Sequence, residues 1–310
     1  MSGEMGLSTA SGASCAVIPS PCRTVTLSSV LGRFDQEAHQ NSFNTGRYRC
    51  PYFSWGAGPP IVFIPGLADN SRSFILPAAG LTEHFQCIAY DLPTGHGDGA
   101  PLRRYTHDDL VADLFDLIDH LSLPRCYLFG SSFGGTVALA ALHARPERFP
   151  RAILQGAFAC RRLAPAEVLL ARLARFWPGS MRHMPFHNRV LRRNHSLAFA
   201  EKSPELWGHF FHHIGSAPMA AVAHHALLLH AVDLRSKLPE IRQPILLVCG
   251  DDDPLVGKDC EEVLLDGLPN AARVELSRCG HFPMFSHAEE LAGVIRQFLT
   301  PHGETTCPFA

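Results

Sequence analysis

A thirteen-residue stretch from Tyr127 to Leu139 constrains the fold of this chain more than any other part of its sequence. Apolar residues lead into Gly-Ser-Ser-Phe-Gly, and an Ala- and Leu-rich segment follows. A strand, a sharp turn and a helix, in that order, are the context in which G-x-S-x-G forms a nucleophile elbow. The turn favours glycine two positions before and after the nucleophile, because a side chain there would collide with the backbone. Only Ser132 has glycine at both positions, since the equivalent neighbours of Ser131 are phenylalanines, so we expect Ser132 to be the nucleophile.

The composition is that of a globular protein with a large core. The 310 residues are 46% apolar and 18% charged, enough for one α/β domain plus an insertion. The formal net charge of −2 predicts no global attraction to nucleic acid or to an anionic membrane. The ten cysteines are scattered without a C-x-x-C pair, which favours free thiols in a reducing compartment over a disulfide framework.

The sequence also gives expectations about location. Residues 1–20 contain no Lys or Arg and do not resemble a signal peptide. The longest apolar run, Met219 to Val232, is interrupted by three histidines, so we predict no membrane span. Together these features predict a cytoplasmic protein.

Short apolar runs alternate with amphipathic helices along most of the chain. Runs of this kind, covered on both faces, indicate a mostly parallel central sheet with helices on both sides, an α/β fold. The predicted strands are 48–55, 61–64, 87–90, 127–129, 151–156, 244–250 and 273–276. Pro51 places the first of these at a sheet edge. Thr106 with Asp109 resembles a capping box at the start of one helix, and Ser286 with Glu289 resembles one at the start of the last.

This alternation divides the chain into regions. It stops between residues 160 and 230, where we expect a helical cap over the carboxyl ends of the strands. The α/β core is then predicted at 45–159 and 231–300. Residues 1–44 are predicted to be a partly disordered N-terminal extension, and 301–310 a C-terminal tail.

The predicted cap is basic, with nine Arg and Lys against three Glu, a net charge of 9 − 3 = +6. The arginines follow no single helical stripe, so we favour a solvated outer face over attraction of an anionic substrate. His209, His212 and His213 have helical spacing but no acidic or cysteine ligand beside them. We therefore interpret them as partly exposed helix surface, and we predict no metal and no cofactor.

Loops that follow the predicted strands carry the groups that acyl chemistry needs. A serine hydroxyl is a poor nucleophile unless a base and an orienting partner assist it. His281 lies after the last strand and is the candidate base, and the order Ser, Asp, His is the one expected for this architecture. Three acids after the preceding strand compete to orient it. We favour Asp253, which precedes Pro254 and lies farthest from the strand, then Asp252, with Asp251 least favoured.

A tetrahedral intermediate also requires backbone N–H donors for its oxyanion. The N–H of Phe133, directly after the nucleophile, is one candidate. The N–H of Leu67, just past Pro65-Gly66, is the second.

Together these motifs resemble the α/β-hydrolase superfamily over roughly Tyr48 to Leu299. The resemblance rests on GSSFGG at 130–135, GDDDP at 250–254 and CGH at 279–281. It implies that Ser132 is the nucleophile, His281 the general base and then acid, and Asp253 the orienting carboxylate. One departure is Pro65-Gly66, where the family often has His-Gly. The implied donor is the backbone N–H of the next residue, so the hole is expected to survive.

The leading hypothesis is a serine hydrolase that cleaves a carboxylic ester of a small molecule through an acyl-enzyme. Carbon–carbon bond hydrolysis or lactonase activity would use the same residues. A third hypothesis, of another class, is a ligand-binding protein of this fold with little turnover. The motifs leave the substrate and the oligomeric state open.

Overall fold

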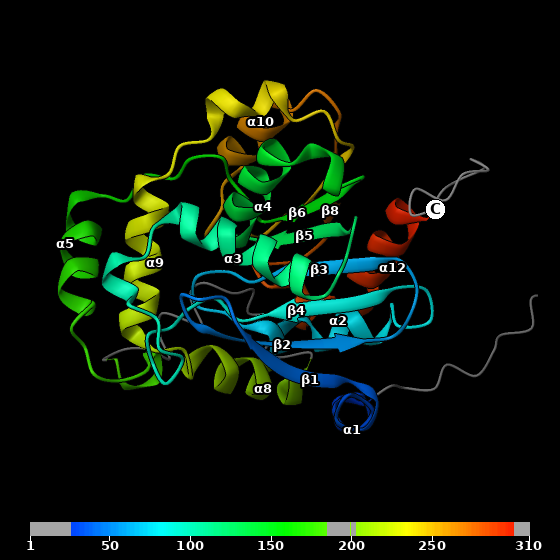
Figure 1. Cartoon of the computed structure of the whole chain (residues 1–310), viewed down its shortest axis with the longest axis horizontal. Coiled ribbons are helices and arrows are strands. Elements are labelled where there is room, and N and C mark those ends of the chain that lie inside the picture. Colours follow the sequence, from blue (N-terminus) through cyan, green and yellow to red (C-terminus); the bar gives the residue numbers. More distant parts are fainter. Residues whose placement is uncertain (1–25, 185–198, 200–202, 301–310) are drawn as a thin grey trace, which may run out of the picture.

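The computed structural model describes residues 26–184, 199 and 203–300, which form one eight-stranded sheet covered by helices (Figure 1). The strand order is β1-β2-β4-β3-β5-β6-β7-β8. The strands are β1 (His39–Asn44), β2 (Arg49–Trp55), β3 (Pro60–Ile64), β4 (Gln86–Tyr90), β5 (Tyr127–Ser131), β6 (Ala152–Gln155), β7 (Ile245–Gly250) and β8 (Ala271–Leu276). β2 is antiparallel to both of its neighbours, and all pairs from β4 to β8 are parallel. The predicted α/β fold class is thus confirmed.

The central strands are apolar throughout because both faces of the sheet are covered. In β3, Ile61 and Phe63 pack into one core cluster, whereas Val62 and Ile64 pack into the cluster on the opposite face. None of these four side chains is exposed. Burial of each stabilises the fold by about 1.5–3 kcal/mol, which explains why no polar alternation marks this strand.

The helices divide between the two faces (Figure 1). The helices are α1 (Leu27–Glu37), α2 (Ile75–Ala79), α3 (His107–His120), α4 (Phe133–Ala144), α5 (Pro165–Ala174), α8 (Pro204–Gly215), α9 (Met219–Ala231), α10 (Lys258–Gly267), α11 (Pro283–Ser286) and α12 (Ala288–Leu299). Short 3-10 turns occur at Ser71–Phe74, Leu102–Arg104, Pro146–Arg148, Met181–His183 and Arg235–Glu240. α3, α4 and α10 contribute to one core cluster, and α1, α2 and α12 contribute to the other. None of the described helices is long and apolar enough to cross a bilayer.

The two predicted helix starts have different outcomes. Thr106 and Asp109 form the predicted capping box at the start of α3. The prediction that Ser286 caps the last helix is wrong: α12 follows His287, which makes no side-chain cap. Ser286 instead ends the short α11, where its hydroxyl donates a hydrogen bond to the carbonyl of Phe282 (3.3 Å). Pro283 begins that separate turn.

The N-terminal region differs from the sequence-based division at residue 44. Residues 27–44 form α1 and the edge strand β1, so β2 lies inside the sheet and its predicted edge position is wrong. β1 is polar and largely exposed, which is why its sequence carries no apolar alternation. α1 is held by Phe34, which is fully buried and makes edge-on contacts with Phe53 (5.0 Å between ring centroids) and Trp55 (5.5 Å). The rest of the predicted extension, and the C-terminal tail, lie outside the described residues.

The interval between β6 and β7 contains α5, α8 and α9 (Figure 1). α9 reaches the loop after β3 through His225, whose ring approaches the carbonyl of Leu67. α8 reaches the same loop through His213, which contacts Asp69. Both helices therefore contact the chain just beyond the carboxyl end of β3.

Because Phe34 anchors α1 to the sheet, we expect Phe34→Ala to lower the free energy of unfolding by about 3–5 kcal/mol, as large-to-small core substitutions do. Urea unfolding followed by circular dichroism measures this loss. Gln36→Ala, at an exposed position of the same helix, is the matched control and should change stability little. A Phe34→Ala protein as stable as this control would show that α1 is not part of the cooperative core.

Candidate active site

Ser132 occupies a strained turn between β5 and α4. Its backbone angles are φ 52° and ψ −118°, in a region that residues with side chains rarely adopt. A Cβ on Gly134 would collide with the carbonyl oxygens of Ile64 and Pro65. A Cβ on Gly130 would lie 2.8 Å from the Cα of Gly135. The preference for glycine at both positions therefore has a direct physical basis: Gly134 packs against the end of β3, and Gly130 packs against the first turn of α4.

Ser131, the neighbouring serine, is part of a hydrogen-bonded support. Its hydroxyl donates to Oε1 of Gln155 in β6 (2.7 Å), and Nε2 of Gln155 donates to the carbonyl of His281 (3.0 Å). Gln155 is completely buried, and its own carbonyl accepts the N–H of Ser132 (2.8 Å). One side chain of β6 thus links the elbow to the His281 loop. The sequence does not reveal this link, since a single Gln at a strand end carries no recognisable signal.

Asp253 and His281 form a buried pair. Nδ1 of His281 lies 2.7 Å from Oδ2 of Asp253, and each side chain is only 4% exposed. The other oxygen of Asp253 accepts the backbone N–H groups of Leu255 (2.8 Å) and Val256 (3.0 Å). Both carboxylate oxygens are therefore engaged, which fixes the orientation of the carboxylate toward the imidazole.

Gly156, directly after β6, makes room for this pair. Its φ is +50°, and a Cβ there would lie 3.0 Å from Nδ1 and Cε1 of His281 and 3.4 Å from Oδ2 of Asp253. The imidazole and the carboxylate thus pack directly against the backbone of the strand that separates β5 from β7.

The pKa of Asp253 is lowered from its ordinary value by competing effects. Burial raises the pKa, but the charge of His281 and its hydrogen bond lower it, as do the hydrogen bonds from Val256 and Leu255. The lowering effects dominate, so the group remains a carboxylate beside the imidazole.

The other two acids of this loop are exposed and make no described hydrogen bond with His281. Asp251 accepts the backbone N–H of Cys279 (3.1 Å) and a hydroxyl hydrogen bond from Ser277 (3.3 Å). Hydrogen bonds from the backbone of Arg278 and Cys279 lower its pKa. Asp252 is exposed, and its N–H donates to the carbonyl of Cys279 (3.0 Å). Of the three, only Asp253 contacts His281 among the described hydrogen bonds.

Ser132 and His281 are brought to the same end of the sheet but are not directly joined. No hydrogen bond between the Ser132 hydroxyl and the His281 ring occurs among the described residues, and the connection runs through Gln155. Catalytic hydrogen bonds are often long before substrate binds and tighten in the complex.

The two candidate oxyanion donors lie at the elbow. Gly66, next to Leu67, is close enough to Ser132 that a Cβ on it would be 3.5 Å from the serine Cβ. A turn closed by the Asp69 N–H and the Gly66 carbonyl (3.3 Å) contains Leu67. Within the described part of the chain, neither the Leu67 N–H nor the Phe133 N–H donates to another group. Both remain available to an oxyanion.

His225 of α9 contacts the two residues that carry these donors, a contact that the sequence did not indicate. Its ring stacks on Phe133 (5.6 Å between centroids, 23° between planes), and its Nδ1 lies 3.5 Å from the carbonyl of Leu67. It is buried, and burial lowers its pKa to about 4, so the imidazole is neutral at pH 7. Its Nε2 has no hydrogen-bond partner among the described residues.

His213 of α8 also differs from prediction. We expected partly exposed helix surface, but His213 is buried, with Nε2 2.7 Å from the Ser73 hydroxyl and 3.2 Å from Oδ1 of Asp69. The Asp69 carboxylate also accepts the Ser73 hydroxyl. The spacing of the histidines could not reveal this contact, because the partner is distant in sequence. In the described residues, no cluster of three or more His, Cys, Asp or Glu is arranged to bind a metal.

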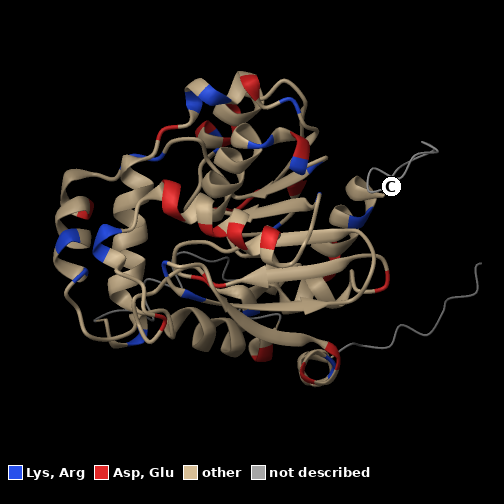
Figure 2. Cartoon of the chain, in the orientation of Figure 1, with Lys and Arg blue, Asp and Glu red and all other residues tan. Residues whose placement is uncertain are grey.

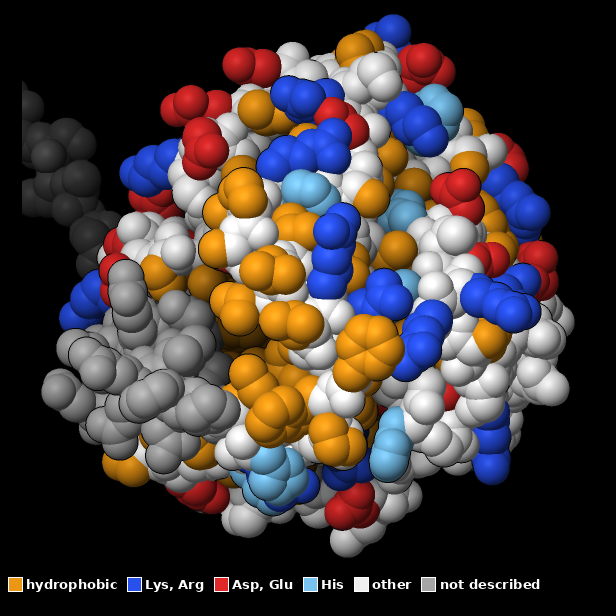
Figure 3. Space-filling model, turned by 90° about the vertical axis from the view of Figure 1, so that its left-hand side faces the viewer, with side chains coloured by type: hydrophobic (Ala, Val, Ile, Leu, Met, Phe, Trp, Pro, Cys, Tyr) orange, Lys and Arg blue, Asp and Glu red, His pale blue; other side chains and the backbone are white. Residues whose placement is uncertain are grey.

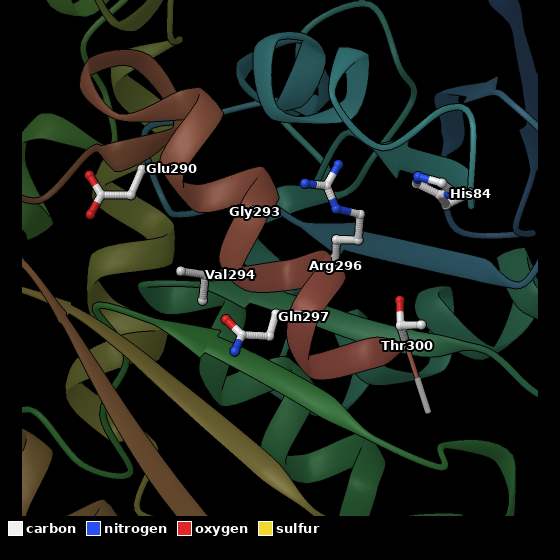
Figure 4. Close-up of a pocket in the computed structure, with 7 residues that line it drawn as sticks. All are labelled: His84, Glu290, Gly293, Val294, Arg296, Gln297 and Thr300. Atoms are coloured by element: carbon white, nitrogen blue, oxygen red, sulfur yellow. The ribbon is translucent and has the colours of Figure 1, made fainter. Parts of the chain in front are cut away.

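A separate hollow of about 630 Å³ lies against α12, lined by residues that include His84, Arg296 and Thr300 (Figure 4). His84 precedes β4, so this hollow is near the amino end of that strand. Ser132, Asp253 and His281 all follow the carboxyl ends of strands. The hollow is therefore not part of the candidate site.

Comparison with known proteins places these features in context. A family model described as alpha/beta hydrolase fold matches residues 59–288. The chain is 28% identical over 247 residues to 3-oxoadipate enol-lactonase 2 of Acinetobacter baylyi, covering 77% of this chain and 90% of that protein. It is 25% identical over 263 residues to the pimeloyl-(acyl-carrier protein) methyl ester esterase of Nitrosospira multiformis, covering 78% and 95%. The fold also matches the solved enol-lactonase from Burkholderia xenovorans, with a TM-score of 0.75, 23% identity, and coverage of 84% and 100%.

The low pKa of His225 predicts a pH dependence of stability. The ordinary pKa is 6.5 and the folded value is about 4, so between these values the unfolded chain binds a proton that the folded chain does not. Stability should therefore fall as the pH falls from 6.5 to 4, with His225 contributing about 1.4 kcal/mol per pH unit. His225→Phe should remove that contribution and leave a shallower slope in urea unfolding at several pH values.

His96, an exposed histidine, supplies the control as His96→Gln. This variant should keep the wild-type slope. An unchanged slope in His225→Phe would mean that His225 is not buried as a neutral group.

Proposed function

This chain belongs to the α/β-hydrolase fold family, and from that premise we propose that it is a serine hydrolase that cleaves a carboxylic ester of a small molecule through an acyl-enzyme at Ser132. The family match covers residues 59–288 and supports an enzyme of the hydrolase class. The observation that carries the proposal is the buried hydrogen bond between His281 and Asp253, at the sheet end where the Ser132 elbow opens. The solved structures that resemble the chain support the fold alone.

In the proposed mechanism, His281 removes the proton of the Ser132 hydroxyl as the oxygen attacks the ester carbonyl. Asp253 holds the Nδ1–H of His281, so that Nε2 is the nitrogen that accepts the proton, and its charge stabilises the imidazolium that forms. His281 then gives the proton to the leaving alcohol. Water, activated by the same imidazole, releases the acid from Ser132.

The backbone N–H groups of Leu67 and Phe133 are the proposed oxyanion hole. Removing one such donor typically costs about 3–4 kcal/mol of transition-state stabilisation, so their placement matters as much as the nucleophile.

We propose that residues 160–230 act as a cap over this site, with 45–159 and 231–300 as the catalytic core. The contacts of His213 and His225 with the loop after β3 support this division. The mechanism uses no cofactor, and the proposed partner is a small-molecule ester. The seven described cysteines are all free thiols, which supports the proposed cytoplasmic location.

Lactone hydrolysis is a second candidate, favoured by the similarity to an enol-lactonase. A lactone is a cyclic ester, so the same attack and the same donors apply. Open-chain esters and lactones require acyl pockets of different shape. Comparing kcat/KM for the two kinds of substrate therefore distinguishes the two activities.

Substitution at the two adjacent serines tests the proposal. Ser132→Ala should lower kcat for a p-nitrophenyl ester by at least about a hundredfold, because the nucleophile is removed. Ser131→Ala is the matched control. It removes only the hydrogen bond from the Ser131 hydroxyl to Gln155, so kcat should fall far less. Circular dichroism of both variants reports whether the fold is kept. Equal losses in the two variants, or turnover by Ser132→Ala at the wild-type rate, would contradict the assignment of Ser132. A wild-type protein without turnover of any ester, lactone or vinylogous diketone would favour the ligand-binding alternative.

A further inference from the structure

Helix α5 carries its apolar side chains on the solvent side. Leu169, Leu170 and Leu173 are 59–65% exposed, and Phe176 and Trp177, just after the helix, are 64% and 42% exposed. We call these five side chains the α5 face. Of the large apolar side chains in the described chain, only Val263 on α10 is otherwise comparably exposed. Isolated exposed apolar residues are ordinary, but five contiguous ones require an explanation.

The arrangement is an inverted amphipathic helix. At about 100° per residue, Leu169, Leu170 and Leu173 fall within roughly 100° of one another around the helix axis. Ala171, on the opposite side, is the only buried residue of α5, and α5 packs against α9. Figure 3 shows the resulting patch of hydrophobic side chains on the surface of the molecule. The helix therefore uses its small side chains to pack and presents its large ones to the outside.

The α5 face is bordered by positive charge. The guanidinium of Arg103 lies 4.5 Å from the centre of the Phe176 ring, and that of Arg175 lies 6.0 Å from it. Arg172 is exposed beside Leu173. Glu167 is the single acid of α5, and Figure 2 shows basic side chains prevailing around this helix. The patch is thus apolar at its centre and cationic at its border, although the whole chain has a net charge of −2.

We propose that the α5 face docks on the surface of an anionic phospholipid bilayer. A helix that presents Leu, Phe and Trp on one face, with Arg at the border, suits the boundary between acyl chains and headgroups. Arginines near an anionic surface each add attraction that depends on salt. The helix lies in the surface and does not span it, in agreement with the absence of a membrane-spanning helix among the described residues.

Charge argues against a second copy of the chain as the occupant. A two-fold contact would place the α5 face against itself, so that the arginine border of one copy would approach the arginine border of the other. Glu167 alone offers a compensating charge within α5. An anionic surface satisfies both the apolar centre and the cationic border.

Vesicle binding by the full-length protein tests this proposal and needs no enzyme activity. Sedimentation with vesicles of phosphatidylglycerol and phosphatidylcholine should pellet the protein, and pure phosphatidylcholine vesicles should retain at least tenfold less. The double substitution Leu170→Ser and Leu173→Ser should weaken binding to anionic vesicles at least tenfold. Val263→Ser, which removes the exposed side chain on α10, is the matched control and should bind as the wild type does.

A charge variant, Arg103→Gln with Arg172→Gln, tests the border separately and leaves the leucines in place. It should weaken binding to anionic vesicles and flatten its decline with added salt, and its circular dichroism should match the wild type. If the wild-type protein does not bind anionic vesicles, the proposal is wrong. This result does not depend on whether the leucine variant folds. Sedimentation velocity showing a wild-type dimer that the leucine variant dissociates, without vesicle binding, would identify a second copy as the occupant and would also overturn it.

Discussion

The left-handed backbone at Ser132 is the constraint on which the rest of the site depends. It turns the chain from β5 into α4 so sharply that Gly134 touches the carbonyl oxygens of Ile64 and Pro65. That contact fixes the loop after β3 against the elbow. Leu67 and Phe133, whose N–H groups are the proposed oxyanion donors, lie in these two segments, and a larger residue at position 134 would push the segments apart.

β6 links the segments that carry the proposed catalytic groups, although it supplies none of these groups itself. Gln155 bonds to Ser131 on one side and to the carbonyl of His281 on the other. Gly156 lets the imidazole and the Asp253 carboxylate rest on the backbone. Because β6 lies between β5 and β7 in the sheet, it separates Ser132, which follows β5, from Asp253, which follows β7. α8 and α9, in the proposed cap, contact the loop after β3 through His213 and His225.

The sequence predicts the features that are local, and it fails where contacts join distant segments. Fully apolar runs identify the buried strands, and glycine spacing selects Ser132 over Ser131, because both patterns reflect local backbone geometry. The choice of Asp253 rested on loop geometry and agrees with its contact to His281. The edge strand β1 is polar, so no alternation of apolar and polar residues predicted it. The spacing of His213 and of the α5 leucines predicts a helix but does not say which face of that helix is buried. Packing against neighbouring elements decides which face is buried.

Labelling with a fluorophosphonate, followed by peptide mass spectrometry, tests the central claim most directly, because the reagent reacts only with a serine that is activated by a base and faces an oxyanion hole. The account predicts a single adduct on Ser132, no adduct on Ser131, and loss of labelling in His281→Ala protein that keeps its fold. A folded protein that is not labelled, or labelling of Ser132 that persists at the same rate without His281, would contradict it.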